Sequence, residues 1–146
     1  MQTITEYLSA EHRHCDDLFA EAEAAAANND LAAAQAKFNA FNQETEHHFQ
    51  KEENIMFPAV EALTGGSCMA GPTSVMRMEH GQMRGLFEDI QAALEAKDTS
   101  ACAGMLETLL IVMQQHNMKE EQMLYQMADR KLENREDIVR EMEALP

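Results

Sequence analysis

The sequence HFQKEE at residues 48–53 recurs 68 positions later as HNMKEE at residues 116–121. In both copies the histidine and the first glutamate are four residues apart, so an α-helix presents them on one face. The repeat extends upstream at the same offset, because the pair EH at residues 11–12 returns at residues 79–80. Within each copy the two histidines are separated by 36 residues. We therefore predict two equivalent helical hairpins, each with one histidine on its first helix and HxxxE on its second.

The composition of the chain favours helices throughout. Ala, Glu, Met, Gln and Leu are abundant, Trp is absent, and there are three prolines among 146 residues. Side chains of this kind lose little conformational freedom in a helix, and β-branched residues are sparse. With 45% hydrophobic residues the chain has enough apolar material for one full core. We predict a single all-α domain over residues 1–146.

Start and stop signals divide this domain into five helices. Thr3 and Glu6 form a capping-box pattern that opens the first helix, and Asp30 can cap the second. Pro58 is expected to kink or end the second helix, and Pro72 suits the first turn of the third. The predicted segments are two hairpins at about residues 3–63 and 72–131, turns at 28–30 and 97–99, a loop at 64–72 that contains Cys68, and a C-terminal helix at about 134–145. Four long helices with short connections pack most economically as an up-down-up-down four-helix bundle.

Positions along antiparallel helices show whether the four histidines of the repeats can meet. Two residues that are equidistant from a connecting turn lie at the same height in such a pair. The midpoint of His12 and His48 is residue 30, and that of His80 and His116 is residue 98, each inside a predicted turn. The midpoint of His48 and His80 is residue 64, where the predicted loop begins. We therefore expect all four histidines in one layer, roughly 27 Å from the turns at 1.5 Å rise per residue.

Four imidazoles and two carboxylates in one layer of a bundle predict a metal site, with donors for two ions. The expected ligands are His12, His48, Glu52, His80, His116 and Glu120. Two histidines per hairpin supply two nitrogens to each ion, and a bridging glutamate supplies an oxygen to each. Mixed imidazole and carboxylate ligation without thiolate suits iron, and manganese or zinc can substitute. Without a metal, several imidazoles and carboxylates would be desolvated in an apolar core, which is costly.

These six positions resemble the hemerythrin-like, or HHE cation-binding, domain family, and the resemblance covers about residues 3–131. It implies a four-helix bundle that holds a non-haem, oxo- or hydroxo-bridged di-iron centre. It assigns the two histidines of each hairpin to one iron, with both glutamates bridging. It also implies a role in handling dioxygen, nitric oxide, peroxide or iron.

The chain departs from the oxygen-carrying hemerythrins near its third histidine. Those proteins resemble this layout but place two histidines one turn apart on the third helix. Here Met76 and Arg84 occupy the positions one turn from His80. Because one imidazole fewer leaves the coordination more open, we expect binding or sensing of dioxygen, nitric oxide or related small ligands rather than simple oxygen transport. Turnover of peroxide or nitric oxide, and donation of iron for repair of damaged iron centres, are open alternatives that use the same ligands.

Other polar and sulfur-containing residues near the repeats receive different interpretations. Glu44, one turn before His48, is expected to support the site as a nearby acid. Four glutamates adjacent to predicted ligands are interpreted as surface charges, with a role as auxiliary ligands left open for the second and fourth: Glu11, Glu53, Glu79 and Glu121. His14 and His47 are expected at the surface or rim, and Cys15 in the core. Methionines at helical spacing are interpreted as deformable core residues: Met76, Met83, Met113, Met123 and Met127.

The net charge limits the partners of the chain. Lys and Arg number 11 against 26 Asp and Glu, which gives a formal net charge of −15. Phosphate backbones and anionic membrane surfaces repel such a chain, so neither nucleic acid nor a membrane is expected as a partner. The three cysteines show no CxxC spacing, and residues 1–11 lack the apolar run of a secretion signal. We therefore expect a reduced, cytoplasmic protein whose partner is a small-molecule ligand.

Overall fold

The computed structural model describes residues 2–63 and 71–146, and all regular secondary structure in these two ranges is helical. The all-α prediction is therefore confirmed for this part of the chain. Residues 64–70 of the predicted loop, which include Cys68, lie outside the described residues. The elements are α1 (Ile4–Ala27), α2 (Leu31–Lys51), η1 (Glu52–Met56), α3 (Phe57–Ala62), α4 (Pro72–Glu95), α5 (Thr99–Lys119), η2 (Glu120–Leu124), α6 (Tyr125–Lys131) and α7 (Arg135–Ala144). The two η segments are short π-helices.

Two helices begin at the side-chain caps that the sequence predicts, and a third begins at an equivalent cap, Asp98. The Thr3 hydroxyl accepts a backbone N–H of the first turn of α1 at 3.0 Å. The carboxylates of Asp30 and Asp98 accept N–H groups at 3.1 Å at the starts of α2 and α5. The residue before each aspartate is left-handed, with φ of 58° at Asn29 and 57° at Lys97. Because these two turns are 68 residues apart, the repeat found in the histidine motifs extends to the turns.

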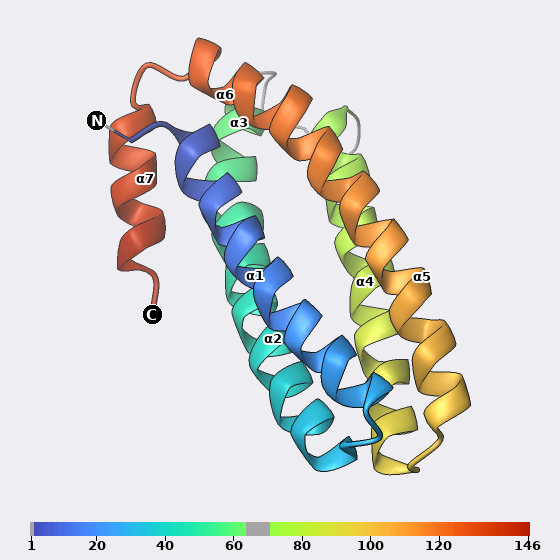
Figure 1. Ribbon diagram of the computed structural model, residues 1–146. Coiled ribbons are helices and arrows are strands. Elements are labelled where there is room, and N and C mark those ends of the chain that lie inside the picture. The colour runs from blue at the N-terminus through green and yellow to red at the C-terminus, as the bar shows by residue number, and fades with distance from the viewer. Residues whose placement is uncertain (1, 64–70) are drawn as a thin grey trace.

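Four long helices lie side by side (Figure 1). α1 packs against α2 and α5, and α4 packs against the same two helices. The short helices α3 and α6 continue α2 and α5 through the two π-turns. α7 contacts α1 and η1, and in Figure 1 it lies beside the N-terminal end of α1.

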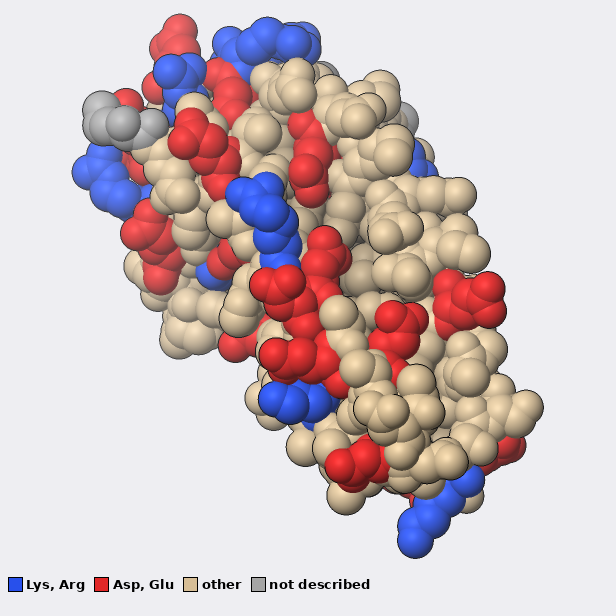
Figure 2. Space-filling model, in the orientation of Figure 1, with Lys and Arg blue, Asp and Glu red and all other residues tan. Residues whose placement is uncertain are grey.

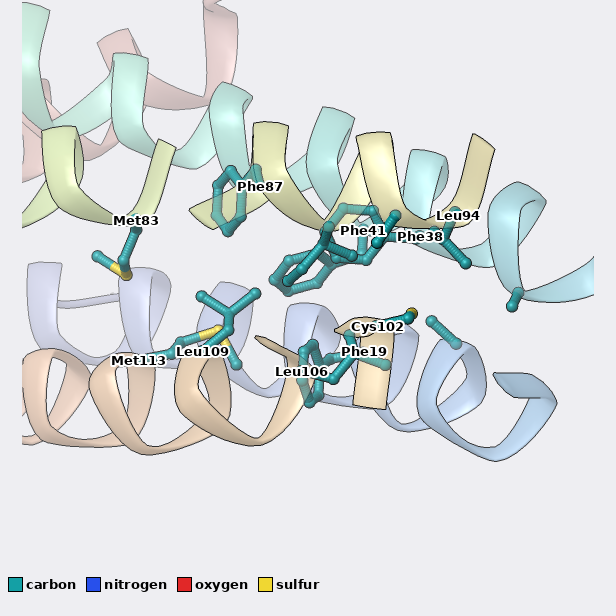
Figure 3. Close-up of a cluster of buried hydrophobic side chains, with 14 of the residues drawn as sticks. Phe19, Phe38, Phe41, Met83, Phe87, Leu94, Cys102, Leu106, Leu109 and Met113 are labelled. Atoms are coloured by element: carbon teal, nitrogen blue, oxygen red, sulfur yellow. The ribbon is translucent and has the colours of Figure 1, made fainter. Parts of the chain in front are cut away.

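Two apolar clusters fill the space between the helices, one on each side of the histidine positions. The cluster toward the two short turns is drawn in Figure 3 and includes Phe19, Phe38, Phe41, Met83, Phe87, Leu106, Leu109 and Met113. The other cluster includes Ile4, Leu8, Met56, Phe57, Val60, Met76, Leu124, Tyr125 and Ile138. Each cluster holds residues from both hairpins, so the histidine layer lies between two packed hydrophobic regions.

Each π-turn begins at the glutamate of an HxxxE motif, and proline does not cause it. Pro58 was predicted to kink or end the second helix. Instead, the irregular turn precedes Pro58, at Glu52–Met56, and the chain continues as α3. The equivalent turn at Glu120–Leu124 is followed by Gln126 where the first copy has Pro58. The π-turn therefore belongs to the repeated motif itself.

The additional residue in the second π-turn changes which side chains face inward. Met123, predicted as a core residue, is 67% exposed, whereas Leu124 and Tyr125 are 2% and 0% exposed. The prediction for Met123 was wrong because it assumed an unbroken helical period. The other predicted core methionines are buried at Met76, Met83 and Met113 and partly buried at Met127.

Acidic side chains outnumber basic ones on the face shown in Figure 2. The uncharged region on the right of that view lies over α5, whose only Asp, Glu, Lys or Arg residues are Glu107 and Lys119. Within residues 2–63 and 71–146, no helix is both long enough and apolar enough to cross a membrane.

Candidate metal centre

All six residues predicted from the repeats meet in one buried layer. The ring centroids of His12 and His48 are 4.7 Å apart, and those of His80 and His116 are 4.9 Å apart. The exposed fractions are between 0% and 4% for His12, His48, Glu52, His80, His116 and Glu120. The height argument from the sequence therefore places these side chains together as the structure does.

The six side chains divide into two groups that share both glutamates. One group is His12, His48, Glu52 and Glu120, and the other is His80, His116, Glu52 and Glu120. In each group the possible ligand atoms lie within 4.8 Å of one another. Such a pair of groups offers two nitrogens and two shared carboxylates to each of two cations. The division matches the assignment that the family resemblance implies, while the role of each residue as a ligand stays a prediction.

The centre contains buried polar atoms that lack hydrogen-bond partners among the described residues. These atoms are Nε2 of His48, His80 and His116, Oε1 of Glu52 and Oε2 of Glu120. The nitrogens lie 3.1 to 3.8 Å from glutamate oxygens, in contacts that are not aligned as hydrogen bonds. Buried polar atoms normally find a partner, and leaving them without one is unfavourable. All five belong to the two groups described above, and nitrogen and carboxylate oxygen are donors that iron, manganese and zinc accept. The residues present therefore fit a pair of cations.

A second carboxylate holds each imidazole through its other nitrogen. The Nδ1 atoms of His48 and His116 lie 2.9 Å from Glu11 and 2.8 Å from Glu79. The remaining two pairs, His80 with Glu53 and His12 with Glu121, are each 2.7 Å apart. Because Nδ1 donates to a carboxylate, a metal ion that displaced the proton on Nε2 would meet a lone pair already directed into the centre.

These four contacts correct the interpretation of Glu11, Glu53, Glu79 and Glu121 as surface charges. Each of these glutamates is adjacent in sequence to one predicted ligand but binds a histidine on the next helix around the bundle. A glutamate of α1 contacts the histidine of α2, and a glutamate of η1 contacts that of α4. In the same way, α4 contributes a glutamate to the histidine of α5, and η2 contributes one to the histidine of α1. The signal was present in the sequence, because all four positions obey the 68-residue repeat.

We call the four glutamates that contact Nδ1 of the histidines the outer glutamates. Lysine or arginine side chains pair with three of them. Lys51 pairs with Glu11, Lys119 pairs with Glu79, and Arg84 binds Glu53 at 2.9 Å. Burial alone would raise the pKa of Glu11, but His48 and Lys51 lower it to about 2. In the same way, His80 and Arg84 outweigh burial and lower the pKa of Glu53 to about 2. The carboxylates that orient the imidazoles are therefore ionised over the whole neutral range.

Glu52 and Glu120, the inner glutamates shared by both donor groups, favour a positive charge on the neighbouring imidazole. Burial lowers the pKa of His80, yet Glu120, Glu52 and Glu53 together raise it to about 10. A proton on His80 therefore balances the buried carboxylates when no metal is bound, and a metal ion would replace that proton.

Tyr125 is a residue of the centre that the sequence reasoning did not single out. Its hydroxyl donates to Glu52 Oε2 at 2.5 Å and lies 3.0 Å from Glu120 Oε1 and 3.1 Å from His12 Nε2. Burial raises the pKa of this phenol, and the nearby charges of Glu120 and Glu52 raise it further. The phenol therefore keeps its proton while no cation is bound. Its counterpart in the first repeat is Phe57, which has no polar atom to offer.

Three other predicted positions lie around the centre rather than in it. Glu44 is exposed, which corrects its prediction as a supporting acid; Thr45 takes the inward position, one residue and about 100° further around α2. His14 is exposed as expected, and His47 is half-buried with its Nε2 3.0 Å from the Leu145 carbonyl. Cys15 is buried in the cluster toward the turns.

The chain matches the family model described as "Hemerythrin HHE cation binding domain" over residues 3–128. The match covers most of the 146 residues, and the chain belongs to this family. No curated protein and no solved structure matches the chain. The resemblance on the histidine motifs is thus confirmed, and it agrees with the buried His and Glu groups of the structure.

Proposed function

We propose that this protein binds two iron ions in the histidine layer and uses them to bind or sense dioxygen, nitric oxide or a related small ligand. The observation that carries the proposal is the pair of buried donor groups that share Glu52 and Glu120. The polar atoms without partners at the same place, and the membership of the family, support a cation site. His12, His48, His80 and His116 would complete the two ligand sets.

The donor chemistry favours iron over softer metals. Nitrogen and carboxylate oxygen are supplied without a thiolate, which suits iron, with manganese or zinc as substitutes. Reduced iron with an open coordination position supplies the chemistry that binds dioxygen or nitric oxide. Arg84, at a position where an additional histidine would lie one turn from His80, turns outward to Glu46 and Glu53 instead. The His80 side therefore gains no further imidazole from this turn of α4.

Burial restricts the kind of ligand that can reach the centre. The six predicted ligands are at most 4% exposed, and aromatic rings cover the His80 side. Phe49 stacks on His80 with ring centroids 3.9 Å apart, and Phe57 lies 5.6 Å away. A molecule of two or three atoms can pass between packed side chains through small fluctuations, whereas a bulky organic substrate requires a larger opening. This favours a diatomic ligand or peroxide.

The test is metal analysis combined with optical spectroscopy. The purified protein is loaded anaerobically with ferrous iron, desalted, and analysed for iron per chain under argon, then exposed to dioxygen or nitric oxide. We expect two irons per chain and a spectral change that one equivalent of ligand completes and that reverses when the ligand is removed. Iron content well below two would contradict the paired centre. Sustained consumption of nitric oxide or peroxide would instead establish the enzymatic alternative, and rapid transfer of iron to a chelator would favour iron donation.

The proposal also includes the architecture that the sequence predicts. We propose that α1, α2 with α3, α4, and α5 with α6 form the up-down-up-down bundle of a single domain, with α7 as the short additional C-terminal helix. The contacts of α1 and α4 with both α2 and α5 support this arrangement.

A further inference from the structure

The hydroxyl of Tyr125 occupies a place that the two donor groups do not explain. The oxygen lies within 3.1 Å of atoms from three predicted ligands, namely Glu52, Glu120 and His12. Tyr125 is 0% exposed, so no solvent competes for this oxygen. Its position is fixed by the π-turn at Glu120–Leu124, which ends directly before it.

The spacing of these atoms is that of ligands around one ion. In an octahedral shell with metal–ligand bonds of about 2.1 Å, neighbouring ligand atoms are about 3 Å apart. The Tyr125 oxygen is 2.5 Å from Glu52 Oε2, 3.0 Å from Glu120 Oε1 and 3.1 Å from His12 Nε2. The phenol oxygen is therefore spaced from the ligand atoms of Glu52, Glu120 and His12 as a further ligand of the same cation would be.

The His12 nitrogen supports the same assignment. Nε2 of each of the four histidines lies between 3.1 and 3.4 Å from an oxygen of Glu52 or Glu120, but among the described residues that of His12 alone also lies beside a phenol hydroxyl, at 3.1 Å from Tyr125. The two halves of the repeat differ at this point, because Phe57 takes the place of Tyr125 beside the His80 group. One half therefore carries an oxygen that the other half lacks.

We infer that Tyr125 is a fifth protein ligand of the ion held by His12 and His48, bound through its phenolate oxygen. This inference rests on the proposed iron pair. As the oxygen–metal bond forms, the O–H bond breaks and its proton passes to solvent water, with no change in the oxidation state of the protein. The ion on the His80 and His116 side has four protein ligands and keeps more open positions, so small ligands bind there.

The inference predicts a colour that the other ligands do not produce. A phenolate bound to ferric iron has a charge-transfer band in the visible region, and resonance Raman excitation in that band enhances tyrosine ring vibrations. The chain contains two tyrosines, which provides a matched control. The Tyr7 hydroxyl accepts a hydrogen bond from Lys51 at 2.7 Å, and Tyr7 does not belong to either donor group.

The experiment loads wild type, Tyr125→Phe and Tyr7→Phe with iron and oxidises each to the ferric form. We expect two irons per chain in all three, the visible band and tyrosine vibrations in wild type and Tyr7→Phe, and complete loss of both in Tyr125→Phe. Wild type labelled with ring-deuterated tyrosine should show shifted vibrations, which tests the assignment even if Tyr125→Phe does not fold. Wild type with two irons but without tyrosine vibrations would overturn the inference alone. Failure of wild type to bind iron would overturn the proposed function, and the ligand assignment with it.

Discussion

At the scale of single residues, the centre depends on carboxylates in two roles. Glu52 and Glu120 lie between the two histidine pairs, while four further glutamates orient the imidazoles from outside. An imidazole that is held at Nδ1 cannot rotate, so its Nε2 is presented in a fixed direction without further loss of conformational entropy on metal binding. The inner carboxylates therefore set the charge of the site, and the outer ones set its geometry.

The inner role predicts the effect of Glu52→Ala. Glu52 belongs to both donor groups, so its removal would take one oxygen donor from each of the two proposed ions. We expect iron to fall from two per chain to one or none after anaerobic loading and desalting. Glu107→Ala, an exposed change on α5, is the control and should keep full loading. Two tightly held irons in Glu52→Ala would contradict the bridging role.

The outer role predicts a smaller effect of Glu121→Ala. This glutamate contacts His12 from the rim of the centre and lies outside the two donor groups. Loss of such an orienting partner commonly weakens metal binding by about 10- to 100-fold. A chelator competition titration should show this decrease with two irons still bound at saturation. Glu44→Ala, which removes an exposed glutamate from α2, should leave the affinity unchanged; equal affinities in the two variants would show that Glu121 does not orient His12.

The outer glutamates also predict acid sensitivity of the metal-free protein. The pKa of Glu11 and that of Glu53 are lowered from 4.5 to about 2, so both groups are more acidic in the folded chain than in the unfolded chain. Their contribution to stability is fully present above pH 4.5 and is lost as the pH falls toward 2. Urea unfolding between pH 7 and pH 3 should show the free energy of unfolding declining only below about pH 5. In Glu11→Gln this decline should be shallower, and an unchanged acid limb would contradict the cause assigned to it.

At the scale of elements, the π-turns explain how two glutamates and Tyr125 reach the same layer. In an α-helix, residues five apart point in different directions, whereas one π-turn brings residues i and i+5 into line. Glu120 and Tyr125 are five residues apart, and the Tyr125 hydroxyl lies 3.0 Å from Glu120 Oε1. Glu52 and Phe57 are also five residues apart in the sequence. The spacing of five recurs in both copies and was visible in the sequence, but the helical period alone does not reveal a π-turn.

The register change in η2 predicts opposite effects at neighbouring residues. An unbroken α-helix after His116 would place Met123 inside, yet Met123 is 67% exposed and Leu124 is 2% exposed. Leu124→Ala should therefore lower the free energy of unfolding by about 2–5 kcal/mol through loss of buried contacts. Met123→Ala should change it by about 0.5 kcal/mol or less. Urea denaturation of both variants measures the difference, and a larger loss in Met123→Ala would show that the helix continues without the π-turn.

At the scale of the whole molecule, the repeat made most of the fold predictable. Offsets of 68 residues fixed the helix pairs, their turns and the common height of the four histidines. The outer glutamates were missed because residue spacing gives height and helix face but not which neighbouring helix a side chain reaches. Tyr125 was missed because its inward direction depends on the π-turn. The prediction for Glu44 was wrong because spacing alone does not show where the buried face of α2 ends. Residues one turn from a ligand can lie on either side of that boundary, and Glu44 lies on the exposed side.

The layered core predicts what happens when metal is removed. The charged layer lies between two apolar clusters, each of which draws residues from both hairpins. These clusters bury their side chains without any cation, so the chelated protein should keep its helical far-ultraviolet circular dichroism. Each ion present at a free concentration of 1,000 times its dissociation constant adds about 4 kcal/mol to the stability of the folded state, which corresponds to a rise in melting temperature on the order of 10 °C per ion. Thermal unfolding with and without a chelator measures this shift, and Glu52→Ala should show a smaller shift on chelation than wild type, because it binds less iron. If chelation abolished the helical signal, the buried glutamates and histidines would outweigh both clusters, and the metal would be required for folding rather than only for stability.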